Sequence, residues 1–217
     1  MQEGNIILNL VASGYLRTDR IIKSFQKIRR VDFVRKQDAK EANVNTPLSI
    51  GYGQTISQPL TVAIMLELLE PKAGEKILDI GSGSGWTVAL LSEIVGSQGK
   101  VYGLEIEKNL VKFGQKNVAK YGFLEKGIAE ILFGDGYEGL PNYAPFDKII
   151  VAAAALNVPE VLIKQLKIGG RLVIPIGQKD GIQDLVVIDK IKALQTKERR
   201  IGGFVFVPLI KNRKINL

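Results

Sequence analysis

Hydrophobic residues along the first third of this chain recur with a helical period. They predict a helix over residues 5–16 and a second helix, capped by Thr18, that continues to Ile28. Residues 31–58 have little periodicity and predict a long ordered loop, and such loops in compact domains are often functional. Pro59 suits the first turn of a third helix. We therefore expect short helices and one long loop to precede the main domain.

From residue 76 onwards, short runs of Ile, Val and Leu alternate with amphipathic segments. The predicted strands cover residues 76–80, 100–105, 130–133, 147–151 and 171–176. The predicted helices cover residues 86–95, 108–121 and 159–166. This alternation indicates βαβ units and a parallel sheet with helices on both faces. Residues 184–191 and 203–209 follow as strands with no helix between them, which predicts an antiparallel edge.

The pattern thus predicts one α/β domain over residues 1–217, with a mostly parallel, doubly wound sheet of the Rossmann-like type. Residues 1–58 would supply extra N-terminal helices and the long loop, residues 59–183 the core, and residues 184–217 the C-terminal edge strands. A chain of 217 residues buries a sufficient core without disulfides or structural metals.

Composition excludes several kinds of chemistry. The chain has no cysteine and no histidine, so it has no thiolate nucleophile, no zinc-thiolate site and no imidazole base. We expect no metal site. No apolar run approaches the roughly 20 residues that cross a bilayer, and residues 1–16 lack the basic region of a signal peptide. We therefore expect a cytoplasmic protein with no membrane partner.

The net charge of +8 is unevenly distributed. Residues 1–40 have five and residues 190–217 seven excess positive charges, whereas residues 41–189 have four excess negative charges. Basic ends can attract nucleic acid or acidic protein segments. Solvated Lys and Arg side chains that maintain solubility are the simpler interpretation.

A glycine-rich loop precedes the helix predicted to begin at Trp86. Gly81, Gly83 and Gly85 allow a tight turn and the close approach of a ligand to the helix N-terminus. The spacing is G-x-G-x-G, not the dinucleotide-binding G-x-G-x-x-G, and Asp79 lies two residues before the first glycine. A carboxylate there would repel a pyrophosphate and attract a cofactor that carries ammonium and sulfonium groups. These features indicate S-adenosylmethionine.

Two more acidic residues follow the next predicted strands. Glu105 ends the second strand, where a carboxylate can bind a ribose diol, and Asp135 follows the third, where it can bind an adenine amino group. Carboxyl ends of neighbouring parallel strands meet at one edge of the sheet, so these side chains and Asp79 would converge. The alternative is a tight turn with solvated acids. The shared register of the loop and the three acids favours the cofactor site.

The loop of residues 47–59 is rich in small residues and hydroxyl groups and leads into a helix N-terminus. Its N–H donors and the helix dipole would suit an anion. A simpler interpretation is a capped loop in which Ser57 bonds only to its own helix.

The order of several motifs resembles the protein-L-isoaspartate O-methyltransferase family over nearly the whole chain. The matching segments are Gly53-Gln54-Thr55-Ile56-Ser57-Gln58-Pro59, Asp79-Ile80-Gly81-Ser82-Gly83-Ser84-Gly85, Gly134-Asp135-Gly136-Tyr137, Ala144-Pro145-Phe146-Asp147, Gly169-Gly170-Arg171-Leu172-Val173-Ile174-Pro175 and Phe206-Val207-Pro208-Leu209. The Gln-Thr-Ile-Ser-Gln-Pro loop is specific to that family, whereas the glycine motif occurs in many methyltransferases. Ala152 and Ile210 depart from the family, which usually has threonine at both positions.

The resemblance implies a monomeric S-adenosylmethionine-dependent enzyme that methylates the free carboxylate of L-isoaspartyl or D-aspartyl residues in damaged proteins and so initiates repair. S-adenosyl-L-homocysteine would be the second product. By resemblance, Ser57 is the active-site hydroxyl, and the residues that contact the cofactor are Gln54, Thr55, Ile56, Gly81, Glu105, Asp135 and Gly136, beside Asp79, Gly83 and Gly85 of the glycine motif. A substrate carboxylate with a pKa of about 4 arrives ionised and needs no histidine base.

Two other functions remain open at this point. A methyltransferase for RNA or a small molecule would fit the basic ends, but the residues after Val151 lack an Asn/Asp-Pro-Pro-aromatic motif and the chain has one tryptophan for base stacking. A non-catalytic binder of damaged protein is the other alternative.

Overall fold

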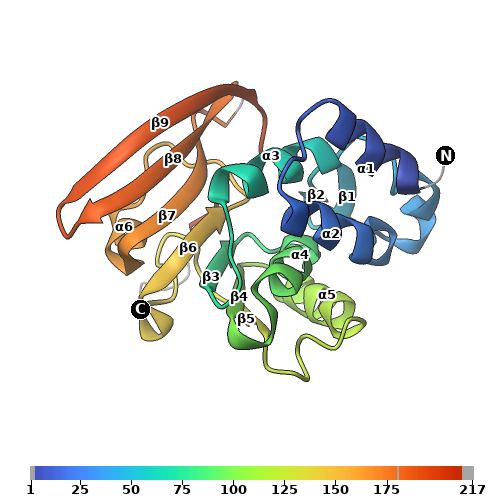
Figure 1. Ribbon diagram of the computed structural model, residues 1–217, viewed down its shortest axis with the longest axis horizontal. Coiled ribbons are helices and arrows are strands. Elements are labelled where there is room, and N and C mark those ends of the chain that lie inside the picture. The colour runs from blue at the N-terminus through green and yellow to red at the C-terminus, as the bar shows by residue number, and fades with distance from the viewer. Residues whose placement is uncertain (1–2, 180, 212–217) are drawn as a thin grey trace.

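A mixed seven-stranded sheet forms the centre of the protein in the computed structural model, which describes residues 3–179 and 181–211. The strand order is β5-β4-β3-β6-β7-β8-β9 (Figure 1). The strands are β3 (Lys76–Ile80), β4 (Lys100–Glu105), β5 (Ala129–Phe133), β6 (Phe146–Val151), β7 (Leu166–Ile176), β8 (Gln183–Lys192) and β9 (Gln195–Phe204). Strands β3 to β7 pair in parallel, and β8 and β9 are antiparallel. The predicted doubly wound fold with an antiparallel edge is confirmed. Residues 1–2, Asp180 and residues 212–217 of the predicted domain parts lie outside the described residues.

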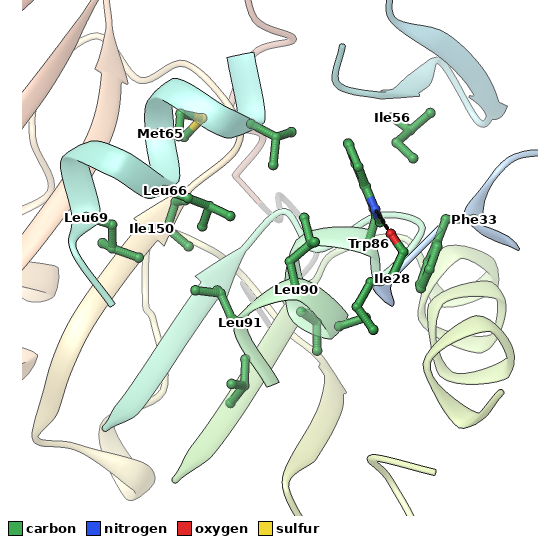
Figure 2. Close-up of a cluster of buried hydrophobic side chains, with 14 of the residues drawn as sticks. Ile28, Phe33, Ile56, Met65, Leu66, Leu69, Trp86, Leu90, Leu91 and Ile150 are labelled. Carbon is green, nitrogen blue, oxygen red and sulfur yellow. Dashed lines mark hydrogen bonds between the residues drawn. The ribbon is translucent and has the colours of Figure 1, made fainter. Parts of the chain in front are cut away.

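Helices cover both faces of this sheet because buried side chains alternate along its strands. The helices are α1 (Glu3–Ala12), α2 (Asp19–Lys27), α3 (Pro59–Leu69), α4 (Trp86–Val95), α5 (Lys108–Ala119) and α6 (Glu160–Gln165). Ile77 packs in one buried cluster with α3 and α4, whereas its neighbour Leu78 packs in the other with Leu162 of α6. Figure 2 shows part of the first cluster, where Leu66 of α3, Leu90 of α4 and Ile150 of β6 lie close together. The core thus holds the carboxyl ends of β3 to β6 in a fixed arrangement.

The N-terminal helices lie at the opposite end of the molecule from β8 and β9 (Figure 1). Helix α1 ends at Ala12 rather than at the predicted residue 16, and the chain turns at Gly14, where φ is +71°. Thr18 occupies the cap position of α2 but its hydroxyl makes no capping bond. It donates instead to Glu67 of α3 at 2.8 Å. The predicted cap is therefore wrong in its bonding, because a carboxylate on another helix, the partly buried Glu67, competes for the same hydroxyl.

The long predicted loop contains regular structure that its sequence pattern did not reveal. Residues 30–33 and 36–41 form 3₁₀ helices, and β1 (Leu48–Gly51) pairs with β2 (Gln54–Ile56) as an antiparallel hairpin. Tyr52 and Gly53 turn this hairpin with φ values of +55° and +71°, as tight hairpin turns require. The segment is ordered, as predicted, but it is not a loop throughout, because these helices and strands are too short to give a periodic signal.

The predicted strand over residues 203–209 is also wrong. Strand β9 ends at Phe204 and consists mostly of exposed polar residues, so it lacks the apolar alternation of a half-buried strand. Residues 205–209 leave the sheet. Val207 accepts a hydrogen bond from the N–H of Ala154 at 2.8 Å, and the N–H of Leu209 donates to Ala154 at 2.7 Å. The chain therefore returns to the carboxyl end of β6.

None of the helices in the described ranges is both long and apolar enough to span a membrane.

Candidate active site

A cleft opens at the carboxyl ends of β3, β4 and β6, and we call it the first cleft. Its empty space is about 770 Å³ when the open solvent at its mouth is included. Its walls come from residues 54–57, 80–84, 86–87, 104–106, 152–153 and 207–210, with Ile50, Val62, Gly134 and Gly136. Residues at the carboxyl ends of the sheet strands supply much of this lining. The β1–β2 hairpin and the returning C-terminal segment supply most of the rest. Segments distant in sequence thus enclose one space.

The glycine loop forms the inner wall of the first cleft. Gly85, the residue before α4, has a φ of +83°, and a Cβ there would lie 2.8 Å from the Val118 side chain and 3.0 Å from the Gly114 carbonyl. Glycine is therefore required at this position by both conformation and close packing. The loop can approach α5 closely, and it presents Gly81 and Gly83 to the cleft.

Glu105 lines the cleft and is fixed by the main chain on both sides. One carboxylate oxygen accepts from the N–H of Gly83 at 2.9 Å, and the other accepts from the N–H of Glu107 at 3.0 Å. The residue is 5% exposed. Each oxygen has a further lone pair, so Glu105 can still accept hydrogen bonds from a ligand in the cleft.

Asp79 and Ser82 carry buried polar atoms without partners. Neither oxygen of the Asp79 carboxyl, nor the Ser82 hydroxyl, has a hydrogen-bond partner among the described residues. Both lie next to Gly103: Asp79 pairs with it in the sheet, and a Cβ on Gly103 would lie 3.1 Å from Cβ of Ser82. Burial, and after it the charge of Glu105, raises the pKa of Asp79 to about 8. Buried groups of this kind normally find partners, so the pair is suited to a polar or cationic ligand group.

Asp135 is buried just behind the cleft. Its carboxylate accepts from the N–H of Tyr137 at 2.8 Å, and its neighbours Gly134 and Gly136 line the cleft. The side chain therefore braces the loop that follows β5.

A second cleft of about 1350 Å³ lies on the other side of the hairpin. Its lining includes Tyr15, Pro47, Gln58, Thr61 and residues 203–207. Four residues line both clefts: Thr55, Ser57, Ala152 and Val207. These four residues form the boundary across which a group could pass between two bound molecules.

Ser57 lies at this boundary, directly before α3. Gln58, not Ser57, occupies the cap position of α3. Within residues 3–179 and 181–211, no hydrogen bond occupies the Ser57 hydroxyl, although its carbonyl accepts from Arg30 at 3.1 Å. The interpretation of Ser57 as a residue that only caps its own helix does not hold, and its hydroxyl is available to a ligand.

Most of the predicted site residues meet in the first cleft. Its lining contains Gln54, Thr55, Ile56, Ser57, Gly81, Gly83, Glu105 and Gly136. Asp79, Gly85 and Asp135 lie behind this surface, so their direct contact with a cofactor stays a prediction. No group of three or more acidic side chains that could hold a metal occurs among the described residues.

Sequence reasoning missed two contributors to the site. Ser82 had no signal beyond its place between glycines. Arg30, which is 4% exposed, reads in the sequence as one more charge in a basic N-terminal part, and only the fold shows that it is buried under the hairpin.

Comparison with known proteins identifies the family. The profile of the protein-L-isoaspartate (D-aspartate) O-methyltransferase family (PCMT) matches residues 1–214. The chain belongs to this family. It is 45% identical over 201 residues to protein-L-isoaspartate O-methyltransferase of Thermococcus onnurineus, covering 93% of this chain and 90% of that protein. It is 42% identical to the Methanopyrus kandleri protein of the same name, covering 94% of this chain and 89% of that one.

A solved structure agrees with this assignment. The crystal structure of a Plasmodium falciparum protein-L-isoaspartate O-methyltransferase, in complex with S-adenosyl-L-homocysteine, superposes with a TM-score of 0.88 at 28% identity. The match covers 98% of this chain and 100% of that chain. The fold class expected from the resemblance is therefore confirmed.

Proposed function

We propose that this protein transfers the methyl group of S-adenosylmethionine to the free carboxylate of L-isoaspartyl, or D-aspartyl, residues in damaged proteins. Family membership supports the reaction. The residues that we assign to the reaction are chosen on one observation. The two clefts share a boundary, which consists of Thr55, Ser57, Ala152 and Val207. A methyl donor in one cleft and a carboxylate in the other would meet there.

The first cleft has the polar groups that the cofactor needs. Ser82 and Glu105 line this cleft, and Asp79 is buried directly behind it. The oxygens of Asp79 and Ser82, which have no partners among the described residues, would receive an ammonium group, and Glu105 has lone pairs for a ribose diol. Gly134 and Gly136 line the cleft beside the end of β5, where Gly134 packs closely on Leu104 and Gly136 on Ile80 and Leu209. When bound, the cofactor supplies an electrophilic methyl group on a sulfonium. For the ammonium group, this fit rests on the oxygen atoms of Asp79 and Ser82, which have no partners among the described residues.

The second cleft suits a peptide. It combines the hydroxyl groups of Thr55, Ser57 and Thr61 with the apolar side chains of Phe204 and Phe206. A carboxylate placed at the boundary could accept hydrogen bonds from Thr55 and Ser57 while the flanking peptide lies along residues 203–207.

Catalysis in this arrangement depends on orientation and not on proton transfer. The substrate carboxylate is already ionised at neutral pH. The hydroxyl group of Ser57 would orient the attacking oxygen, and the walls would exclude water that solvates it. Because the carboxylate loses negative charge as it is methylated, a few neutral donors serve better than a cation, which would hold the ground state too tightly. Ser57 and Thr55 are neutral donors.

The proposal extends to the acceptor, the oligomeric state and the cellular compartment of the protein. The acceptors would be isoaspartyl-containing peptides and proteins, the enzyme would act as a monomer, and its compartment would be the cytoplasm. Nucleic acid is not expected as a substrate, since the described residues that line the second cleft include no cluster of cationic side chains.

Labelled methyl transfer tests the function. The protein is incubated with methyl-labelled S-adenosylmethionine and an isoaspartyl peptide, its aspartyl counterpart, or RNA. We expect label in the isoaspartyl peptide alone. Equal labelling of both peptides, or labelling of RNA only, contradicts the proposal. Tight binding of S-adenosylhomocysteine without label in any acceptor would indicate a non-catalytic binder.

A further inference from the structure

Arg30 is a buried cation at the base of the hairpin, outside both clefts. Its two terminal nitrogens donate to five main-chain carbonyls, with distances between 2.9 and 3.4 Å. The acceptors are Ala42, Val44, Thr46, Ile56 and Ser57. Two of these, Ile56 and Ser57, line the first cleft. One side chain thus holds both ends of the segment that carries the hairpin.

The same guanidinium also packs on Trp86, a residue that lines the first cleft. Its central carbon lies 5.5 Å from the centre of the Trp86 ring. Trp86 is the first residue of α4, follows Gly85 of the glycine loop, and lines the first cleft. Its indole N–H donates to the Ile28 carbonyl at 3.4 Å (Figure 2). Arg30 therefore lies between the glycine-loop helix and the Ser57 segment.

The segment that carries Arg30 is itself firmly attached to α5. Phe33 stacks on Tyr121 with ring centres 5.8 Å apart, and the Tyr121 hydroxyl donates to Asp32 at 2.8 Å. Lys120 also donates to the carbonyl of Asp32. The guanidinium is thus carried by a short 3₁₀ helix that packs on the two residues that follow α5.

Main-chain carbonyls, and not carboxylates, compensate the buried charge of Arg30. Arg30 has no carboxylate partner among the described residues, its Nε atom has no hydrogen bond, and burial lowers its pKa to about 10. Burying a charge without an opposite charge is costly, and an apolar residue in its place would leave five carbonyls without this donor. The carbonyls that it gathers give a reason for its presence.

We propose that Arg30 is a positioning residue for methyl transfer. Its guanidinium fixes the main chain of Ile56 and Ser57 against Trp86, so that the boundary between the two clefts keeps the geometry that in-line transfer needs. This inference rests on the proposed function. A displacement of about 1 Å in such a site can reduce turnover by about 100-fold, so the effect should exceed what lost stability explains.

The test compares Arg30→Met with Lys190→Met. Lys190 is a matched control because it is 7% exposed, donates to the carbonyls of Ile163, Lys164 and Leu166, and lines neither cleft. Both variants are assayed at the same interval below their own Tm. For Arg30→Met we expect kcat to fall at least about 10-fold, with the Kd of S-adenosylhomocysteine changed less than about 3-fold; Lys190→Met should keep its kcat.

Amide hydrogen exchange gives a readout that does not need activity. In Arg30→Met, exchange should accelerate at residues 54–57, and in Lys190→Met at the start of β7 instead. Should Arg30→Met be too unstable to purify, Arg30→Lys serves in the same comparison, because it keeps the charge but lacks the two-pronged donor geometry. Unchanged exchange at residues 54–57, or equal kcat for the two variants, overturns the proposal.

Chemical rescue separates positioning from general damage. A cleft of about 720 Å³, lined by Arg30, Ile28, Ala42 and Trp86, leads to the guanidinium position. In Arg30→Ala, millimolar guanidinium, far below denaturing concentrations, should restore part of kcat, and it should not restore Lys190→Ala. Absence of rescue together with loss of cofactor binding would mean that Arg30 is only structural. If the wild type methylates no isoaspartyl peptide, the proposed function fails, and the exchange experiment still decides whether Arg30 anchors the hairpin.

Discussion

The Glu105 carboxylate accepts a 2.9 Å hydrogen bond from the main-chain N–H of Gly83. This bond joins the end of β4 to the glycine loop that follows β3, so one acidic side chain both shapes the loop and faces the first cleft. Replacing Glu105 should therefore affect the loop and the ligand together.

For Glu105→Ala we expect weaker binding of S-adenosylhomocysteine by about 1 to 3 kcal/mol, the usual cost of losing hydrogen bonds to a charged group. Isothermal titration calorimetry measures this directly. At saturating cofactor, kcat should change much less than the affinity. An unchanged affinity would show that Glu105 serves only the Gly83 and Glu107 amides.

Ser57→Ala should have the opposite effect. Because the Ser57 hydroxyl lies at the boundary between the clefts, its loss should reduce kcat by about 10-fold or more while cofactor affinity stays nearly intact. Ser49→Ala is the matched control, since Ser49 lies on the same hairpin and its hydroxyl accepts from Gly51 at 3.3 Å. Loss of cofactor binding in Ser57→Ala, with kcat unchanged at saturation, would contradict the assigned role.

Asp79 should make the stability of the ligand-free protein depend on pH. Its pKa rises from 3.8 to about 8 on folding, so between these values the folded chain binds a proton that the unfolded chain lacks. The free energy of unfolding should then fall as pH rises from about 4 to about 8 and change little above that range. Denaturant titrations of wild type and Asp79→Asn at several pH values measure the slope.

In Asp79→Asn this slope should flatten, and at pH 8 the variant should be more stable than the wild type by roughly 2 to 5 kcal/mol. An identical slope in both proteins would mean that Asp79 ionises at its ordinary pKa. An ammonium group bound beside Asp79 should displace the proton. Calorimetry in two buffers with different heats of ionisation would then show proton release on binding of S-adenosylhomocysteine.

Gly85→Ala should destabilise the fold by about 2 to 4 kcal/mol, because a Cβ at this left-handed position would lie 2.8 Å from the Val118 side chain. Gly74→Ala is the control: its φ is +79° but no atom lies within 4 Å of the added Cβ. It should cost only about 1 kcal/mol. Thermal unfolding of the two variants gives the difference, and equal costs would show that the contact with α5 relaxes freely.

The central sheet and most of the first cleft could be predicted from the sequence, because strands such as Lys76–Ile80 are rich in Ile and Leu and the glycine loop has a local signature. The β1–β2 hairpin could not, since three or four residues give no period. Strand β9 was misplaced because an exposed edge strand needs no apolar residues. Arg30 could not be identified because burial of a charge depends on tertiary contacts that no local pattern encodes.

The boundary between the clefts also has a consequence for how the protein loses activity. Thr55 and Val207 face the same space although roughly 150 residues separate them in the chain, and contacts of such long range close late in folding. Val207 lies on residues 205–209, which belong to no strand and are bonded to the rest of the protein through Ala154 and Gln183. On heating, the contacts at this boundary should therefore break before the sheet unfolds. Enzymatic inactivation should then occur at a lower temperature than the loss of the circular dichroism signal.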